Sequence, residues 1–283
     1  ATSSTSEQDD RWYSLHTHLP ILEPSNIQEA KDYTRRAFEL SERYNLPVII
    51  NAPSKLCHNI GSLTLGSLPE KCIGMGDGIF EKNPSRYINL FAGSVANHRK
   101  AMEQKALLAR DIPELGINTI IPGNSHVGFI SSSVNYAYLR EALALLGIGD
   151  CPILKIGMSH PLNLKEIISF ARELERIIVV EDLEGFLEFQ IKSLLFGSGI
   201  RATVEGKNIF PPYGELDVDS ITQALANALQ KPLPERMKRA LEREKKLTSD
   251  IPPRQGSFCI GCPHRATVYA IVKATDRKAI FAG

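Results

Sequence analysis

The chain has 283 residues, and its 33 Lys+Arg against 32 Asp+Glu give a formal charge of 33 − 32 = +1 with neutral histidines. This balance argues against a nucleic-acid-binding protein, which needs a basic surface for phosphates. Apolar residues make up 43% of the sequence, and no apolar run approaches the roughly 18 residues of a membrane span, so neither disorder nor membrane insertion is expected. Five cysteines do not make a disulfide framework, which predicts a cytoplasmic location.

The N-terminal part is predicted to hold a long helix and then a less regular segment. Ser25 and Gln28 have the spacing of a capping box, and apolar residues then recur at helical intervals, which predicts an amphipathic helix over about 26–45. A short buried strand is expected at 46–50. The stretch from about 52 to 122 has the character of a crossover linker. It contains loops around 61–86 and one helix over about 97–110.

From Val127 onward, apolar runs alternate with amphipathic segments. Strands are predicted near 127–131, 152–157, 176–181 and 200–204, and helices near 134–146, 164–174, 184–196 and 219–230. This alternation predicts a mostly parallel sheet with right-handed crossovers and helices on its faces. Asn163 and Glu166 resemble a second capping box. We therefore predict an α/β domain over 123–230.

Two polar pairs are candidates for a site. Glu181 and Asp182 follow a buried strand, at the edge where open α/β sheets bind ligands. They either bind or orient a ligand, or Asp182 caps the next helix, and the cap is the preferred interpretation. His16 and His18 have metal-like spacing on a predicted strand, but no third ligand lies nearby in the sequence, so a surface pair is preferred.

The segment 231–246 carries seven basic and three acidic residues, 7 − 3 = +4, in a helical pattern. It is either a docking surface for an acidic electron carrier or, as preferred, a solvated helix and linker.

The sharpest motif is C-I-G-C-P-H-R at 259–265. Cys259 and Cys262, separated by two residues before a helix, have the spacing of metal or cluster ligands. The other cysteines supply no second pair for a zinc site; they are Cys57, Cys72 and Cys151. A redox pair and two reduced cysteines in a tight turn stay open. Gly76-Asp77-Gly78 has the opening of a thiamine-diphosphate metal motif but, with no buried strand leading into it, is interpreted as a turn.

Four segments together resemble the large (α) subunit of indolepyruvate:ferredoxin oxidoreductase. They are S-S-T-S-E-Q-D-D-R at 3–11, L-E-P-S-N-I-Q-E-A-K-D at 22–32, V-E-D-L-E-G-F-L-E-F-Q at 180–190 and C-I-G-C-P-H-R at 259–265. The resemblance spans essentially the whole chain. It implies an α/β fold of parallel-sheet, three-layer domains of the thiamine-diphosphate enzyme type. The implied domains are the end of a pyrimidine-binding domain (1–55), a crossover linker (56–122), a transketolase-C-terminal-like domain (123–230), a charged linker (231–254) and the start of a pyrophosphate-binding domain (255–283).

The resemblance also implies a reaction. An aryl pyruvate of the indolepyruvate type is decarboxylated oxidatively to an acyl-coenzyme A, with ferredoxin as electron acceptor and a small β subunit as partner. The implied cofactors are thiamine diphosphate, Mg²⁺ and [4Fe-4S] clusters, with coenzyme A as co-substrate. The magnesium ligands are expected beyond Gly283, and the ylid-activating glutamate upstream of Ala1, so no catalytic residue is assigned and the segment by itself is expected to be inactive.

Site residues follow from the matched segments. The resemblance implies that Cys259 and Cys262 help to hold a cluster, that His264 and Arg265 lie near the diphosphate or substrate, and that four residues line the substrate side. These four are Ser3, Ser4, Glu7 and Gln8. Thr5-Ser6 replaces the family's usual Gln-Asn, which leaves another acyl specificity open, and Ile260 stands where Pro is common. A non-catalytic α/β module that binds a partner through its terminal strand is the alternative from another class.

Overall fold

The computed structural model describes residues 7–67, 82–248, 251–252, 258 and 260–278, and the chain divides into two units at residue 235. The first unit holds the helices α1 (Trp12–Thr17), α2 (Ile27–Tyr44), α3 (Ser54–Cys57), α4 (Pro84–Tyr87), α5 (Ala92–Leu115), α6 (Ser133–Leu145), α7 (Leu164–Ala171), α8 (Phe186–Leu195) and α9 (Val218–Ala228). Its strands are β1 (Ile21–Leu22), β2 (Ile49–Ile50), β3 (Thr119–Ile121), β4 (Val127–Ser132), β5 (Ile153–Ile156), β6 (Met158–His160), β7 (Arg176–Val180) and β8 (Thr203–Glu205). The second unit holds α10 (Glu235–Thr248) and α11 (His264–Ala274).

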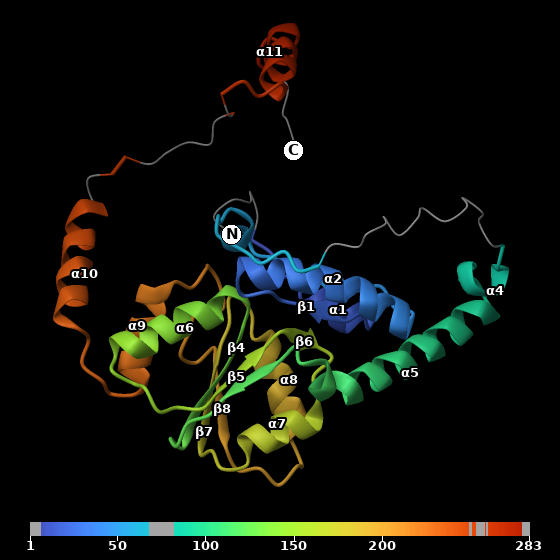
Figure 1. Ribbon diagram of the computed structural model, residues 1–283. Coiled ribbons are helices and arrows are strands. Elements are labelled where there is room, and N and C mark those ends of the chain that lie inside the picture. Colours follow the sequence, from blue (N-terminus) through green and yellow to red (C-terminus); the bar gives the residue numbers. More distant parts are fainter. Residues whose placement is uncertain (1–6, 68–81, 249–250, 253–257, 259, 279–283) are drawn as a thin grey trace. The chain divides into compact units, whose positions relative to one another are not determined.

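A five-stranded sheet forms the centre of the first unit, in the order β3-β5-β4-β7-β8 (Figure 1). The four strands β5, β4, β7 and β8 are parallel, which confirms the predicted α/β alternation. β3 differs because it runs antiparallel to β5 at one edge, and it comes from the segment that the sequence assigned to the linker. An antiparallel edge strand on an otherwise parallel sheet is common in α/β folds.

Helices cover both faces of this sheet. Neighbouring strand residues point to opposite faces, so Phe129 packs with α6 and α9 while Ile130 packs with α7 and α8. Ile177, Ile178, Val179 and Val180 in β7 are fully buried, as a central parallel strand requires. The three-layer arrangement of the predicted fold class is therefore present.

A smaller sheet, in the order β2-β1-β6, joins the N-terminal segment to the large sheet. β1 is parallel to β2 and antiparallel to β6, and β6 follows β5 directly after Gly157. Helices α2 and α5 pack over this sheet in one apolar cluster with Leu22 and Met158 at 0% exposure. Buried Lys155 in β5 pairs with Glu29 in the first turn of α2, which adds a polar link between the sheets.

Helix α2 begins one residue later than the predicted capping box implies, because its N-cap is not Ser25 but the next residue. Asn26, in an extended conformation, is the N-cap, and its side chain accepts a hydrogen bond from Glu29 N at 2.8 Å. The Glu29 carboxylate in turn accepts from the backbone and hydroxyl of Ser25, both at 2.9 Å. The start of α2 is thus capped by Asn26, and Glu29 binds back to Ser25, whereas Gln28 donates to Asp32 and does not close the predicted box.

The prediction that His16 and His18 lie on a strand is wrong. His16 is in α1, and His18 is its left-handed C-cap with φ of 62°. The alternating H-T-H pattern is overridden because Trp12 on this short helix packs edge-on against Phe186, with ring centroids 5.5 Å apart. His18 Nδ1 lies 3.1 Å from Lys105 Nζ, and the His18 and His98 rings are 5.5 Å apart, so His18 faces α5.

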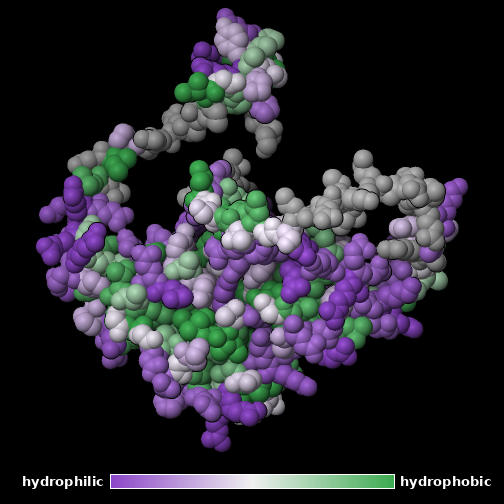
Figure 2. Space-filling model, in the orientation of Figure 1, coloured by the Kyte–Doolittle hydropathy of each residue, from purple (hydrophilic) through white to green (hydrophobic). Residues whose placement is uncertain are grey.

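The described part of the second unit contains the helices α10 and α11. Figure 2 shows hydrophilic side chains over most of α10, which agrees with the charged sequence predicted for this segment. None of the described side chains of α11 is buried. Among the described residues, none of the helices combines the length and apolarity needed to cross a bilayer.

Gly157 lies at the junction of the two sheets, where the backbone and side chains approach closely, and its substitution tests this packing. A Cβ at this position would lie 2.3 Å from Tyr33 Oη and 2.5 Å from the backbone oxygen of Ile117. We expect Gly157→Ala to lower the free energy of unfolding by about 2–3 kcal/mol, measured by urea denaturation, because the backbone has to shift. Gly149→Ala is the matched control, since its Cβ meets nothing within 4 Å. Equal stabilities of the two variants would contradict the close approach.

Candidate functional site

A cavity of about 230 Å³ lies where β4 and β7 end. Ser132 is the last residue of β4 and Ser133 follows it, and Asp182 and Leu183 follow β7. The chain proceeds from β4 to β5 on one side of β4, and later to β7 on its other side, so this is a switch point of the sheet. Open α/β sheets bind ligands at such points. The remaining lining residues come from 8–11, Glu23, 51–55, 134–135 and Glu215.

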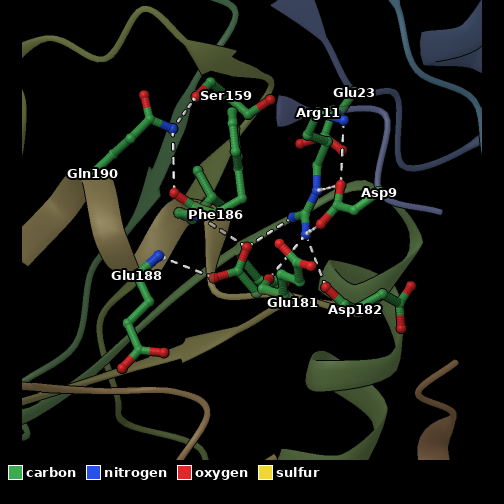
Figure 3. A network of polar contacts seen from close by, with 12 residues as sticks. Asp9, Arg11, Glu23, Ser159, Glu181, Asp182, Phe186, Glu188 and Gln190 are labelled. Carbon is green, nitrogen blue, oxygen red and sulfur yellow. Dashed lines mark hydrogen bonds and ion pairs between the residues drawn. The ribbon is translucent and has the colours of Figure 1, made fainter. Parts of the chain in front are cut away.

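Arg11 fixes the N-terminal segment to this edge of the sheet (Figure 3). Its Nη1 donates to Glu181 Oε2 at 2.7 Å, and its Nε and Nη2 donate to the two Asp9 carboxylate oxygens at 2.8 and 2.6 Å. Nη2 also donates to the backbone oxygens of Asp182 and Glu184, at 2.8 and 3.1 Å. The Arg11 side chain is 6% exposed and that of Glu181 is 1% exposed, so the ion pair is buried.

Glu181 also performs the capping role that the sequence assigned to Asp182. Its two carboxylate oxygens accept from Leu187 N and Glu188 N, each at 2.9 Å, at the start of α8. Asp182 instead accepts from Leu216 N at 2.7 Å. The prediction of an Asp182 cap is therefore wrong by one residue. The longer Glu181 side chain comes directly from the end of β7 and meets the free amides of the first turn.

Burial and charge act in opposite directions on this pair. Burial alone would lower the pKa of Arg11, but the hydrogen bond with Asp9 and the charges of Glu181, Glu23 and Asp9 raise it above its ordinary value. Burial raises the pKa of Glu181, against the lowering effect of Arg11 and the two α8 amides. Lys207, whose Nζ donates to Glu181 O at 2.6 Å, is a third charged group at this edge, and burial lowers its pKa.

The cavity also contains buried polar atoms and unusual backbone. Glu23 Oε2 and Asn135 Oδ1 have no hydrogen-bond partner among the described residues. Ser133 and Leu183 have φ of 53° and 54°, a left-handed conformation that is costly for residues other than glycine. Such backbone is often found at binding sites, which supports a functional role for this edge.

A second buried polar cluster surrounds His160, at the end of β6. Gln190 Nε2 donates to Ser159 O and Phe186 O, so its Oε1 is free to accept from His160 Nδ1 at 3.0 Å. This places the proton of the neutral imidazole on Nδ1. Burial lowers the pKa of His160 to about 4, partly offset by the Gln190 hydrogen bond.

The structure brings one of the predicted substrate-side residues to the cavity. Gln8 lines it, whereas exposed Glu7 accepts a hydrogen bond from Gly214 N at 2.8 Å through Oε1. Ser3 and Ser4 lie outside the described residues, as do Gly76–Gly78 and Cys259. The roles predicted for these residues stay predictions.

The C-I-G-C-P-H-R motif lies in the second unit. Cys262 Sγ is 3.5 Å from His264 Nδ1, and Cys262 and Arg265 line one open hollow with Tyr269. Within the described part of the chain, no group of three or more His, Cys, Asp or Glu side chains is placed to hold a metal ion.

The sequence by itself does not mark Arg11, Glu23 or Asn135 as site residues. A signal for the first was present, because a carboxylate at the buried end of β7 needs a cation, and Arg11 stands in a segment quoted for its family resemblance. Glu23 likewise stands in a quoted segment, at 22–32, whereas Asn135 lies in no such segment and becomes a site residue only through neighbours distant in the sequence.

The family model and the relatives that match this chain carry the same description. Residues 120–249 match the family model described as an indolepyruvate oxidoreductase domain. The chain is 36% identical over 283 residues to the indolepyruvate oxidoreductase subunit IorA of Pyrococcus abyssi, covering 99% of this chain and 44% of the relative. It is 33% identical to the subunit of the same name from Archaeoglobus fulgidus, over 97% of this chain and 43% of the relative. The chain thus spans less than half the length of these relatives.

The fold also resembles a solved enzyme. That structure is the 2-oxoglutarate:ferredoxin oxidoreductase from Magnetococcus marinus with 2-oxoglutarate, coenzyme A and succinyl-CoA bound. The TM-score is 0.52 at 16% sequence identity, over 79% of this chain and 45% of that chain. The likeness concerns the fold, and it confirms the predicted fold class.

Removing Arg11 should destabilise the first unit strongly. We expect Arg11→Met to lower the free energy of unfolding by about 3–5 kcal/mol, because Glu181 and Asp9 would stay buried without their cation. Urea denaturation followed by circular dichroism measures it. Arg35→Met is the control, since the Arg35–Glu39 pair is exposed and should change stability by less than about 1 kcal/mol. Similar losses in both variants would contradict a special role for Arg11.

His160 predicts a pH dependence of stability. The imidazole of the unfolded chain is protonated below its ordinary pKa of 6.5, whereas the pKa of His160 in the folded protein is about 4. The contribution of neutral His160 to the free energy of unfolding is therefore fully present above pH 6.5 and is lost as the pH falls toward 4. We expect wild type to lose about 2 kcal/mol more than His160→Asn between pH 8 and pH 5, measured by urea unfolding. Asn keeps a donor for Gln190. Parallel pH profiles for the two proteins would refute the buried neutral imidazole.

Proposed function

Because this chain is related over nearly its whole length to indolepyruvate oxidoreductase subunits, we propose that it is part of the large subunit of such an enzyme. The family resemblance predicted from the sequence is confirmed. The proposed reaction is the oxidative decarboxylation of an aryl pyruvate to an acyl-coenzyme A, with ferredoxin as electron acceptor. The observation that carries the proposal is the alignment over 99% of the chain.

Thiamine diphosphate belongs to this proposal. When bound, it supplies the nucleophilic carbon and the electron sink for a 2-oxoacid. Arg265 offers a suitable cation in the open hollow beside Cys262, since a guanidinium binds phosphate oxygens in pairs. We propose that Arg265 and His264, in the first turn of α11, contact the diphosphate.

An iron–sulfur cluster does not fit the described residues by themselves. A [4Fe-4S] cluster takes four thiolates, and Cys262 is the described member of the predicted pair. The roles of Cys259 and Cys262 as cluster ligands therefore stay a prediction, and so does the expected magnesium site. We assign no step of the reaction to the cluster or to the magnesium ion. The small β subunit, coenzyme A, ferredoxin and a cytoplasmic location belong to the same proposal.

The described residues contribute the placement of the N-terminal segment. Arg11 and Asp9 hold this segment against the end of β7, and Glu7 accepts from Gly214, so the backbone between them is fixed at both ends. Gln8 lies between these anchors, and besides the cavity it lines a second, open hollow beside α1. We propose that Gln8 contacts the substrate on the side of this second hollow, and that Glu7 and Arg11 act as positioning residues.

The test is turnover by the whole enzyme. The large subunit containing this segment, purified anaerobically with its β subunit, is assayed for coenzyme A-dependent reduction of ferredoxin. Indolepyruvate and phenylpyruvate should be used with a kcat/KM at least about tenfold above that of pyruvate or 2-oxoglutarate. A preference for either non-aromatic acid would assign another acyl specificity. No activity with any 2-oxoacid would contradict the proposal.

Gln8→Ala tests the substrate contact. We expect KM for the aryl pyruvate to rise about 3–10-fold, the effect of one lost neutral hydrogen bond, with kcat less affected. Glu42→Gln, an exposed change on α2, is the control and should leave both constants unchanged. Unchanged KM in the Gln8 variant would remove this residue from the substrate site.

A further inference from the structure

Two buried oxygens in the cavity call for hydrogen-bond donors. Glu23 is 2% exposed; its Oε1 accepts from Asn51 Nδ2 at 2.9 Å, but its Oε2 has no partner among the described residues. Asn135 is 4% exposed, and its Oδ1 also has no partner there. A buried polar atom without a partner costs about 1–3 kcal/mol. Each oxygen therefore indicates a donor that binds in the cavity.

The charge of the cavity selects the kind of donor. Its lining contains five carboxylates and two cations, 2 − 5 = −3; the carboxylates are those of Asp9, Asp10, Glu23, Asp182 and Glu215. Both cations are already engaged. Arg11 pairs with Asp9 and Glu181, and Lys55 Nζ donates to Leu216 O at 2.9 Å and pairs with Glu215 at 3.3 Å.

Glu23 itself forms no ion pair with any of the residues that the structure describes, although the charge of Arg11 acts on it. A buried carboxylate is stable when a cation compensates it. An anionic ligand would add to the repulsion. A divalent metal ion lacks a sufficient ligand group in the described part of the chain. A cation that carries N–H donors satisfies both the charge and the two oxygens.

We propose that this cavity binds a primary ammonium group, which donates hydrogen bonds to Glu23 Oε2 and Asn135 Oδ1. The cavity, at about 230 Å³, is large enough for such a group with part of its carbon chain. The ammonium belongs either to a small free amine or to a lysine side chain of a polypeptide. The site goes beyond the proposed oxidation, because it takes a cation and not the anionic 2-oxoacid.

The first experiment compares two probes on the unchanged full chain. Calorimetric titration with methylammonium should show saturable binding, and thermal denaturation should show a higher midpoint in its presence. Tetramethylammonium carries the same charge without N–H donors, so it should bind at least tenfold more weakly. Equal binding of the two probes, or equal binding of potassium, would overturn the proposal.

Variants then assign the binding to the cavity. Glu23→Gln removes the charge but keeps an oxygen for Asn51, and should weaken methylammonium binding at least tenfold. Asn135→Ala should weaken it about threefold to tenfold, the effect of one hydrogen bond. Glu42→Gln makes the same change of charge at an exposed position and should bind as wild type does. Wild-type affinity in folded Glu23→Gln, or in Asn135→Ala if the first variant does not fold, would overturn the site.

A third probe separates the two sources of the ammonium group. If Nα-acetyl-lysine N-methylamide binds at least tenfold more tightly than methylammonium, the natural occupant is a lysine side chain. If it binds no more tightly, the occupant is a free amine, and either result supports an ammonium site. Binding is measured without 2-oxoacid turnover, so a failure here is distinct from a failure of the proposed reaction.

Discussion

The buried guanidinium of Arg11 is the group on which the candidate site depends. Three buried or half-buried carboxylates, those of Asp9, Glu23 and Glu181, act on its single positive charge. Removing these groups from water is expensive, so the network is weak evidence for stability gained by its presence. The role of the network is to position the N-terminal segment. The N–H donors of Arg11 bind it to the residues between the end of β7 and the start of α8 (Figure 3).

The same edge of the sheet explains why the cavity is there. β4 lies between β5, the next strand in the sequence, and β7. The chain therefore leaves β4 toward one side of the sheet and leaves β7 toward the other, and a crevice is left between the two loops. Glu23 and Asn51, which directly follow β1 and β2 of the smaller sheet, line this opening, and the Lys155–Glu29 pair links α2 to β5. The cavity is therefore a product of two sheets, one at each side, and its excess of carboxylates reflects both.

Much of the fold could be predicted because its signals are local. Apolar runs and helical periodicity placed the strands and helices between 127 and 230 within a few residues, except β6, which was not predicted, and Asn163 caps α7 as its spacing predicted. Errors occurred where a distant contact decided between local alternatives. Trp12 packs against Phe186 and turns the H-T-H segment into a helix, and the capping of α8 moves to Glu181 because Arg11 compensates its charge.

By itself, the sequence determined the α/β class, the alternation of strands and helices and the family resemblance, because periodicity and motifs reside in neighbouring residues. It also indicated Gln8 through that resemblance. Only the tertiary structure decided the partnership of Arg11 with Glu181, 170 residues apart, and the shared cavity of Glu23 and Asn135. The physical reason is that burial, charge compensation and hydrogen-bond satisfaction are properties of a position in space, to which residues distant along the chain contribute together.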